Sequence, residues 1–164
     1  MVAFAERDGH DAELWGVTGL LHDADYERFS DMDDTERGHP RTIIAELRSR
    51  DAPPEMVRAI ASHADFMEVA RETPMEKTLF AVDELSGFLV ACAAVRPEGI
   101  HGLTPKSVRK KLKQPSFAAG VHREEVYAGA ELLGVELDEH IANVVSALQP
   151  IAKELGLRTQ ADAA

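Results

Sequence analysis

The amino-acid sequence predicts an all-α protein with a single domain. Aromatic residues make up only 5% of the 164 residues, and patterns of alternating β-branched residues are scarce, so there is little material for a sheet. Apolar residues recur instead at spacings of three and four, which is the period of an amphipathic helix. A chain of this length buries one good core. We therefore expect one helical domain over residues 1–157, followed by a flexible tail over residues 158–164.

The first part of the chain contains four predicted helices. Residues 1–7 look like the last part of a helix, and the next helix ends at His22. A third helix follows Pro40, and the pair Pro53-Pro54 opens a fourth that ends at His63, because proline is favoured in the first turn of a helix. The apolar residues of these last three helices are, in order, Leu14, Val17 and Leu21; Ile43, Ile44 and Leu47; and Met56, Ala59 and Ile60.

Capping motifs mark two further helix starts. Residues 73–76, Thr-Pro-Met-Glu, combine a Thr cap, a proline at the first helical position and a Glu that reaches back, which is a capping box. We expect a long helix from there to about Val95. The pair Thr104-Pro105 repeats the signal and opens another helix.

The last two predicted helices are separated by Gly134, which is suited to end a helix in the left-handed conformation. Asp138 is expected to cap the final helix. That helix carries apolar residues up to Ile151, and Pro150 is expected to kink it.

The overall charge limits the classes of partner. The chain has 18 basic and 29 acidic side chains, a net charge of −11, which argues against a general affinity for nucleic acids or anionic membranes. The one cysteine, Cys92, has no partner for an internal disulfide. The sequence shows neither a secretory leader nor an apolar run long enough to span a membrane. These features predict a cytoplasmic protein.

Histidine and aspartate residues at several predicted helix ends are candidate metal ligands. His22 and Asp23 are adjacent, and Asp83 lies on an apolar face where an unpaired carboxylate is costly. His39 precedes a helix and His63 ends one on its core-facing side. Each histidine alone is more often a structural residue, and Asp83 could also pair with a buried arginine. Together, however, the five residues suffice for two cations bridged by a carboxylate.

The order His22-Asp23, His39, His63 and Asp83 resembles the HD-domain superfamily of metal-dependent phosphohydrolases, which are helical proteins. The chain looks closer still to small stand-alone bacterial HD proteins of the HDIG type, which are predicted hydrolases. The phrases that carry this likeness span about residues 9–140, and they are residues 13–16, 19–26, 77–87, 117–120 and 123–125.

This resemblance implies a role for each residue. His22, Asp23 and Asp83 would hold a first metal, with Asp23 bridging to a second metal held by His39 and His63. The metals would be one or two divalent transition ions, Mn, Fe, Co, Ni or Zn, with Mg as a further candidate. A metal-activated water would attack a phosphorus ester. Asp23 and Asp25 are the expected catalytic carboxylates, and Asp25 would orient a water or a ligand.

One position departs from the family pattern. HD proteins carry a further histidine for the first metal on the helix before the His-Asp helix, whereas here only His10 lies upstream, in a connecting turn. If residues 1–7 are the end of that helix, its start is cut away. The alternative is a degenerate site with a weakened first metal.

The region from residue 96 to residue 123 holds seven basic side chains and one acidic side chain, whereas residues 1–40 hold three and eleven. Arg96, Lys110 and Arg123 are the candidates for binding an anionic substrate, because guanidinium and ammonium groups bind phosphate. The alternative is a solvated surface that offsets the acidic N-terminal part of the chain.

These observations predict a metal-dependent phosphohydrolase that acts on a small phosphorylated metabolite or a nucleotide. Two other functions stay open at this stage. The same ligands could form a di-iron site that activates dioxygen, as in relatives of this fold. Alternatively, an impaired HD domain could bind a nucleotide or a protein partner without turnover.

Overall fold

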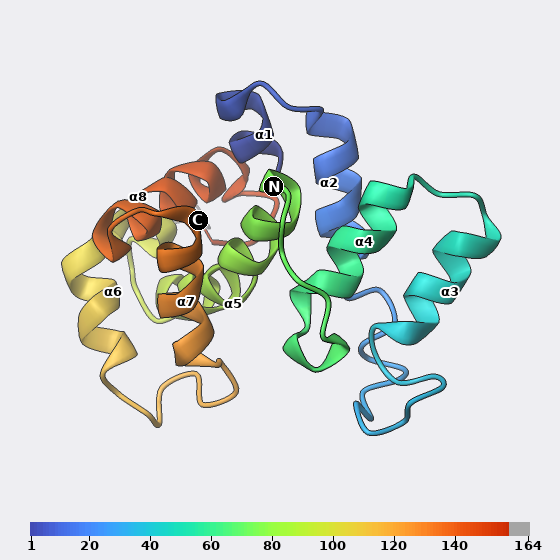
Figure 1. The fold of residues 1–164 in the computed structure, drawn as a ribbon. Coiled ribbons are helices and arrows are strands. Elements are labelled where there is room, and N and C mark those ends of the chain that lie inside the picture. Colours follow the sequence, from blue (N-terminus) through green and yellow to red (C-terminus); the bar gives the residue numbers. More distant parts are fainter. Residues whose placement is uncertain (158–164) are drawn as a thin grey trace. The chain divides into compact units, whose positions relative to one another are not determined.

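The computed structural model describes residues 1–157, so the predicted tail over 158–164 lies outside the described residues. Every regular element of the described part is helical (Figure 1), which confirms the all-α prediction. The chain forms two compact units, one over Met1–Phe80 and one from Ala81 onward. A single domain over 1–157 stays a prediction. Among the described helices, none combines the length and the apolar character that crossing a bilayer requires.

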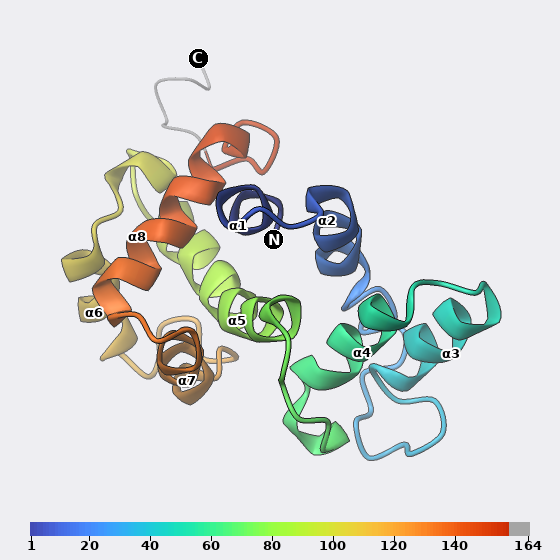
Figure 2. The ribbon, with the colours of Figure 1, turned by 45° about the horizontal axis from the view of Figure 1, so that its top comes forward.

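The first unit contains α1, α2, α3, α4, the short 3-10 helix η1 and the start of α5. Their bounds are Val2–Asp8, Ala12–Leu21, Arg41–Ser49, Pro54–His63, Asp65–Met67 and, for α5, Pro74–Ala94. Helix α2 packs against α1 and α4, and α3 packs against α4 (Figure 2). The core between α3 and α4 is formed by Ile43, Ile44, Leu47, Met56, Val57 and Ile60. The predicted apolar faces of these two helices are therefore confirmed.

Helix α2 buries two of the three residues expected on its apolar face, together with two others. Leu14 and Leu21 are partly buried against the core between α3 and α4. The side chains of Trp15 and Thr18 are buried, whereas Val17 is exposed. A threonine is tolerated inside because its hydroxyl donates to the carbonyl oxygen of Leu14 at 2.7 Å. Asp11 caps the start of the helix, and its carboxylate accepts from the backbone N–H of Leu14 at 2.9 Å.

The predicted capping box at the start of α5 is present. The backbone N–H of Thr73 donates to Glu76 at 3.0 Å, and the N–H of Glu76 donates to the Thr73 hydroxyl at 3.4 Å. Glu76 is fully buried and pairs with the Nε of Arg58 at 2.9 Å. Burial alone would raise the pKa of Glu76, but the N–H groups of Thr73 and Glu72 and the charge of Arg58 together hold it below its ordinary value of 4.5.

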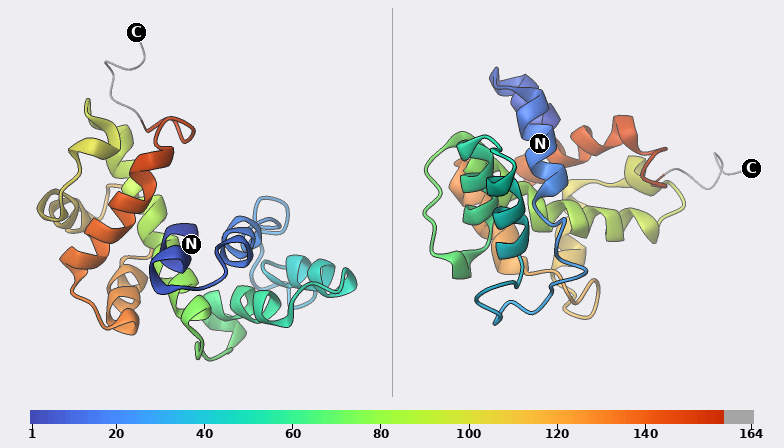
Figure 3. Two further views of the ribbon diagram at one scale, coloured as in Figure 1. Left: turned by 90° about the horizontal axis from the view of Figure 1, so that it is seen from above. Right: turned by 90° about the vertical axis from the view of Figure 1, so that its right-hand side faces the viewer.

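The second unit contains the rest of α5 followed by η2, α6, α7, α8 and η3. Their bounds are Gly99–Gly102, Pro105–Leu112, Arg123–Leu133, Leu137–Leu148 and Gln149–Ile151. Helix α8 packs against α6 and α7 (Figure 3). The predicted cap at Thr104 is a capping box with Ser107, and Gly134 ends α7 with a φ of 67°. Both predictions are confirmed.

Two predictions about α8 are wrong. The residue before the helix is Glu136, and Asp138 is the second residue of the helix rather than its cap. In that first turn a carboxylate still interacts favourably with the helix dipole, and Asp138 also lies 3.4 Å from Arg109. Pro150 does not kink the helix, because the α-helix has already ended at Leu148 and Pro150 lies in a 3-10 turn.

Candidate metal centre

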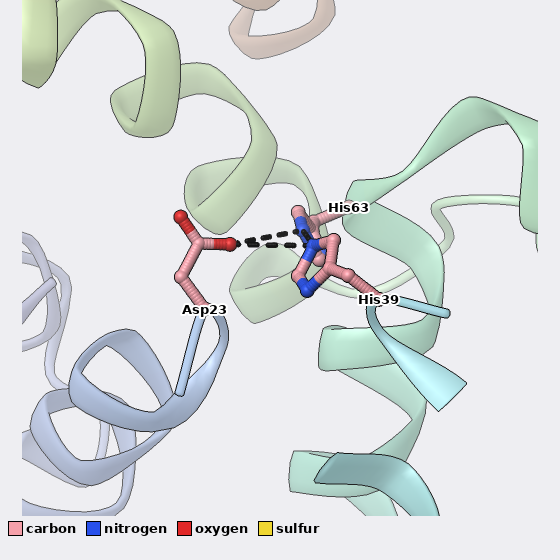
Figure 4. A group of neighbouring side chains, drawn as sticks. All are labelled: Asp23, His39 and His63. Carbon is pink, nitrogen blue, oxygen red and sulfur yellow. Dashed lines mark hydrogen bonds and ion pairs between the residues drawn. The ribbon is translucent and has the colours of Figure 1, made fainter. Parts of the chain in front are cut away.

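Asp23, His39 and His63 lie together in the first unit, although they come from three separate elements (Figure 4). Asp23 follows α2, His39 lies in the loop before α3, and His63 is the last residue of α4. Oδ1 of Asp23 is 3.3 Å from Nε2 of His39 and 3.7 Å from Nε2 of His63. The two Nε2 atoms are 3.2 Å apart. Two imidazoles and one carboxylate oxygen therefore converge on a single point.

His22 extends this group on the other side of Asp23. It immediately follows the last residue of α2, and its Nε2 atom is 3.4 Å from Oδ2 of Asp23. One oxygen of the Asp23 carboxylate therefore faces His22, while the other faces His39 and His63. This division of the two oxygens is what a carboxylate needs in order to bridge two cations.

The Nδ1 atom of each histidine has a partner that only accepts hydrogen bonds. Nδ1 of His22 lies 2.7 Å from the carbonyl oxygen of Gly19, and Nδ1 of His63 lies 2.6 Å from that of Ile60. Nδ1 of His39 lies 2.6 Å from Oδ1 of Asp25. Each Nδ1 must therefore carry the proton and donate it. In the neutral imidazoles Nε2 is left as a lone-pair donor.

This arrangement of donors fits a metal ion. The Nε2 atoms of His39 and His63 face one another and a carboxylate oxygen, so three electron-pair donors meet at short range. A proton added to one of these atoms would form a hydrogen bond between only two of them, whereas a cation can accept an electron pair from all three. Imidazole nitrogen combined with carboxylate oxygen favours divalent ions such as Mn, Fe, Co, Ni and Zn. The residues present therefore fit the type of cofactor expected from the sequence.

Asp25 lies behind His39, where it is buried. Its Oδ1 atom accepts from His39, and its Oδ2 atom accepts from the backbone N–H of Ile43 at 2.8 Å. Such a carboxylate fixes the tautomer and the orientation of an imidazole ligand. Of the two roles expected for Asp25, this contact supports the orientation of a ligand. The catalytic roles of Asp23 and Asp25 stay predictions.

The group is open to solvent on one side. His39 and His63 are buried, whereas 49% of the Asp23 side chain is exposed. Solvent therefore reaches the carboxylate of Asp23, while the two imidazoles are covered. Tyr26, which the sequence analysis did not single out, lies against His39 and is also exposed. The available signal was its position three residues after Asp23, within the HD-like phrase.

A comparison with protein-family models agrees with this geometry. The model of the HD domain matches residues 1–87, which is more than half of the chain. The chain belongs to the HD-domain family. HD domains in general bind divalent metals and have functions of the metal-dependent phosphohydrolase type. Neither a curated protein nor a solved structure matched the chain.

The HD match includes Asp83, which lies in the second unit, and also His22, Asp23, His39 and His63. Asp83 is half-buried on α5, and its role as a ligand stays a prediction. The substrate-binding residues expected from the sequence belong to the second unit as well. Arg96 donates to the carbonyl oxygen of Gly102 at 3.1 Å, and Lys110 is exposed on α6. Their contact with a substrate also stays a prediction.

Arg123 of the HD-domain chain has a different environment from the one expected. All five of its guanidinium N–H groups have a backbone carbonyl partner, and these belong to Leu112, Gln114, Phe117, Ala118 and Val121. This arrangement secures the loop between α6 and α7. It favours a structural role for Arg123 over contact with a substrate.

The second unit contains two further histidines and a cysteine whose environments bear on reactivity. Nδ1 of His122 donates to Glu84 at 2.8 Å, and this hydrogen bond raises the pKa of His122. His140 is buried and its Nε2 atom bonds the carbonyl oxygen of Ala81 at 2.8 Å. Cys92 is buried among apolar residues, and burial raises the pKa of its thiol to about 11. Such a thiol is a poor nucleophile, in agreement with the core position expected for Cys92.

Proposed function

We propose that this HD-domain protein is a metal-dependent phosphohydrolase that cleaves the phosphoester bond of a small phosphorylated metabolite or nucleotide. The observation that supports this most strongly is the meeting of the Nε2 atoms of His39 and His63 with Oδ1 of Asp23, while both Nδ1 atoms are bonded to acceptors. Because these groups lack a proton to share, they are arranged to bind a cation.

One metal site would be formed by His39, His63 and Oδ1 of Asp23. The other would be formed by His22 and Oδ2 of Asp23, with Asp83 as a further ligand on the strength of the sequence resemblance. One or two divalent ions bound there would lower the pKa of a water molecule and neutralise the charge that develops on the phosphoryl oxygens.

The residues of the chain contribute orientation and access. The carboxylate of Asp25 holds the proton of His39 on Nδ1 and keeps Nε2 directed at Asp23. The carbonyl oxygens of Gly19 and Ile60 do the same for His22 and His63. Because each of these Nδ1 atoms has a hydrogen-bond partner within the chain, the three imidazoles are oriented before a ligand arrives.

The half-exposed Asp23 places the open side of the group where a small substrate can enter. The net charge of −11 disfavours a long polyanion such as RNA, because its many phosphates would meet an acidic surface. A compact phosphoester has a single charged group that the site itself would neutralise. We therefore expect small molecules rather than polymers as substrates.

The test is the release of inorganic phosphate from a panel of phosphomonoesters and nucleotides. The protein is first freed of metal with a chelator and then supplied with Mn²⁺, Co²⁺, Ni²⁺ or Mg²⁺. We expect release only after a metal is added, and a loss of roughly 100-fold or more in His39→Gln. The matched control is His101→Gln, which removes an exposed histidine of the second unit. Release that persists in chelator or in His39→Gln would overturn the proposal, as would dioxygen uptake in place of phosphate release.

A further inference from the structure

Tyr26 is an exposed aromatic residue in direct contact with the metal centre. Its ring centroid lies 5.2 Å from that of His39, with an angle of 83° between the ring planes. Despite this contact, 43% of Tyr26 is exposed. The exposed part of the ring is aromatic surface that a ligand can contact.

Tyr26 and Asp23 belong to one turn after α2, and both contact the imidazole of His39. The N–H of Tyr26 donates to the carbonyl oxygen of Asp23 at 3.0 Å, which closes a tight turn. Within that turn Asp25 points inward to His39, while Asp23 and Tyr26 are both exposed. Because both side chains contact His39, a molecule bound at the carboxylate of Asp23 comes close to the ring of Tyr26.

The ring is also held in place before any ligand arrives. Tyr26 rests on the imidazole of His39, and that imidazole is fixed by its 2.6 Å hydrogen bond to Asp25. A preorganised aromatic surface binds a flat ring with little loss of side-chain entropy. Stacking of a base on an aromatic side chain tolerates many base types, because every base has a π face.

A second exposed aromatic residue in this unit is less suited to such a role. Phe66 lies three residues after His63 and is about as exposed as Tyr26. However, the guanidinium of Arg41 lies over its ring, 5.4 Å from the centroid. The ring of Phe66 thus contacts Arg41, whereas the ring of Tyr26 contacts a histidine of the metal centre. This leaves Tyr26 as the better stacking surface next to the metal centre.

We propose that Tyr26 selects the substrate by stacking against a flat aromatic group, so that the site prefers a nucleoside monophosphate to the phosphate of a sugar or a polyol. This inference rests on the proposed function only in that the phosphate is taken to bind at the cluster of Asp23, His39 and His63. Tyr26 then contacts the base and acts on specificity, while the cluster acts on the phosphate.

The experiment compares two probes that differ by the base alone, adenosine 5′-monophosphate and ribose 5-phosphate. Their dissociation constants are measured by calorimetry with the full chain in the presence of Mn²⁺, and phosphate release is measured in parallel. The variants are Tyr26→Leu and Tyr26→Phe. The matched control is Tyr127→Leu, which removes a tyrosine of similar exposure, 47%, from α7. Phe66→Leu serves as a second control within the same unit.

The expected result is that the wild-type chain binds the nucleotide about tenfold more tightly than ribose 5-phosphate, which corresponds to the stacking of one base. Tyr26→Leu removes this difference and leaves the affinity for ribose 5-phosphate unchanged, whereas Tyr26→Phe and both controls retain it. A wild-type chain without a preference would overturn the inference. So would an equal loss for both probes in Tyr26→Leu, because that would mean that Tyr26 only supports His39.

The two proposals fail in different ways. If the nucleotide preference depends on Tyr26 but no phosphate is released from either probe, the proposed hydrolysis is wrong and the inference about Tyr26 holds. If phosphate is released at equal rates from both probes, with equal affinities, the hydrolysis holds and the inference is wrong.

Discussion

Replacement of Asp25 by alanine tests whether the metal centre depends on the buried carboxylate behind it. In the structure Asp25 accepts two hydrogen bonds, from Nδ1 of His39 at 2.6 Å and from the N–H of Ile43 at 2.8 Å. Alanine leaves both buried donors without an acceptor, and each such donor costs about 1–3 kcal/mol. We therefore expect Asp25→Ala to lower the free energy of unfolding by about 2–5 kcal/mol in the absence of metal.

The same substitution weakens metal binding for a separate reason. Without Asp25, the proton of His39 is no longer confined to Nδ1 and the ring is no longer held in the orientation that directs Nε2 to Asp23. Loss of such a supporting partner typically lowers metal affinity by about 10- to 100-fold. Asp25→Asn keeps one acceptor oxygen and is expected to show a smaller loss of stability, because one of the two donors stays satisfied.

Stability is measured by urea denaturation in chelator, and metal affinity by competition with a chromophoric chelator. Asp33→Asn is the control, because Asp33 is an exposed aspartate in the loop between α2 and α3. We expect this control to match the wild type in both assays. An Asp25→Ala chain that binds metal with unchanged affinity would refute the argument that Asp25 orients His39.

Three further predictions concern parts of the fold outside the metal centre. The pKa of Glu76 is lowered in the folded chain, so its stabilising contribution is complete above the ordinary pKa of 4.5 and is lost as the pH falls through the lowered value. In urea denaturation with chelator between pH 3 and 6, the free energy of unfolding should therefore fall less steeply with decreasing pH in Glu76→Gln than in the wild type. Gly129→Ala should destabilise the chain by about 1–2 kcal/mol, since a Cβ there would lie 2.7 Å from the Cα of Ala81, and an unchanged thermal midpoint would contradict this close approach. Arg123→Lys should lower the thermal midpoint and increase proteolysis of the loop before α7, because a lysine cannot replace five N–H donors; equal rates of cleavage in wild type and variant would contradict the structural role.

Helix positions were predictable where a local signal sets them. The capping boxes at Thr73 and Thr104 and the left-handed glycine at Gly134 depend only on neighbouring residues, and the structure contains all three. The cap of the last helix was not predictable in the same way. Glu136 makes no capping hydrogen bond with its side chain, so it carries no local signal, and Asp138 was mistaken for the cap.

The buried face of α2 could not be inferred from periodicity alone. Leu14 and Leu21 follow a helical spacing and pack against the core, as expected. Val17 shares that spacing but is exposed, whereas Trp15 and Thr18 are buried. The contacts of Trp15 and Thr18 do not follow from the spacing of apolar residues. The indole of Trp15 stacks on His10 at 4.8 Å, and the Thr18 hydroxyl is satisfied within its own helix.

For the site, the sequence predicts the types of residue but not their partners. The resemblance singled out His22, Asp23, His39 and His63, and the structure places these four together. The hydrogen bonds that fix each Nδ1 atom involve backbone carbonyls and the carboxylate of Asp25, and carbonyl partners leave no pattern in a sequence. For Arg123 the residue type suggested phosphate binding, but its guanidinium donates instead to backbone carbonyls of the neighbouring loop.

The most direct test of the central claim is elemental analysis of the chain purified without chelator and without a metal-affinity step. The account predicts roughly one to two equivalents of a divalent transition metal per chain. In Asp23→Ala the bound metal should be lost while the helical circular dichroism is retained, and in Asp83→Ala it should be reduced or lost. His101→Gln should bind as much metal as the wild type. Wild-type protein without metal after incubation with Mn²⁺ or Zn²⁺ followed by desalting, or Asp23→Ala with unchanged metal content, would contradict the assignment of this group as the metal centre.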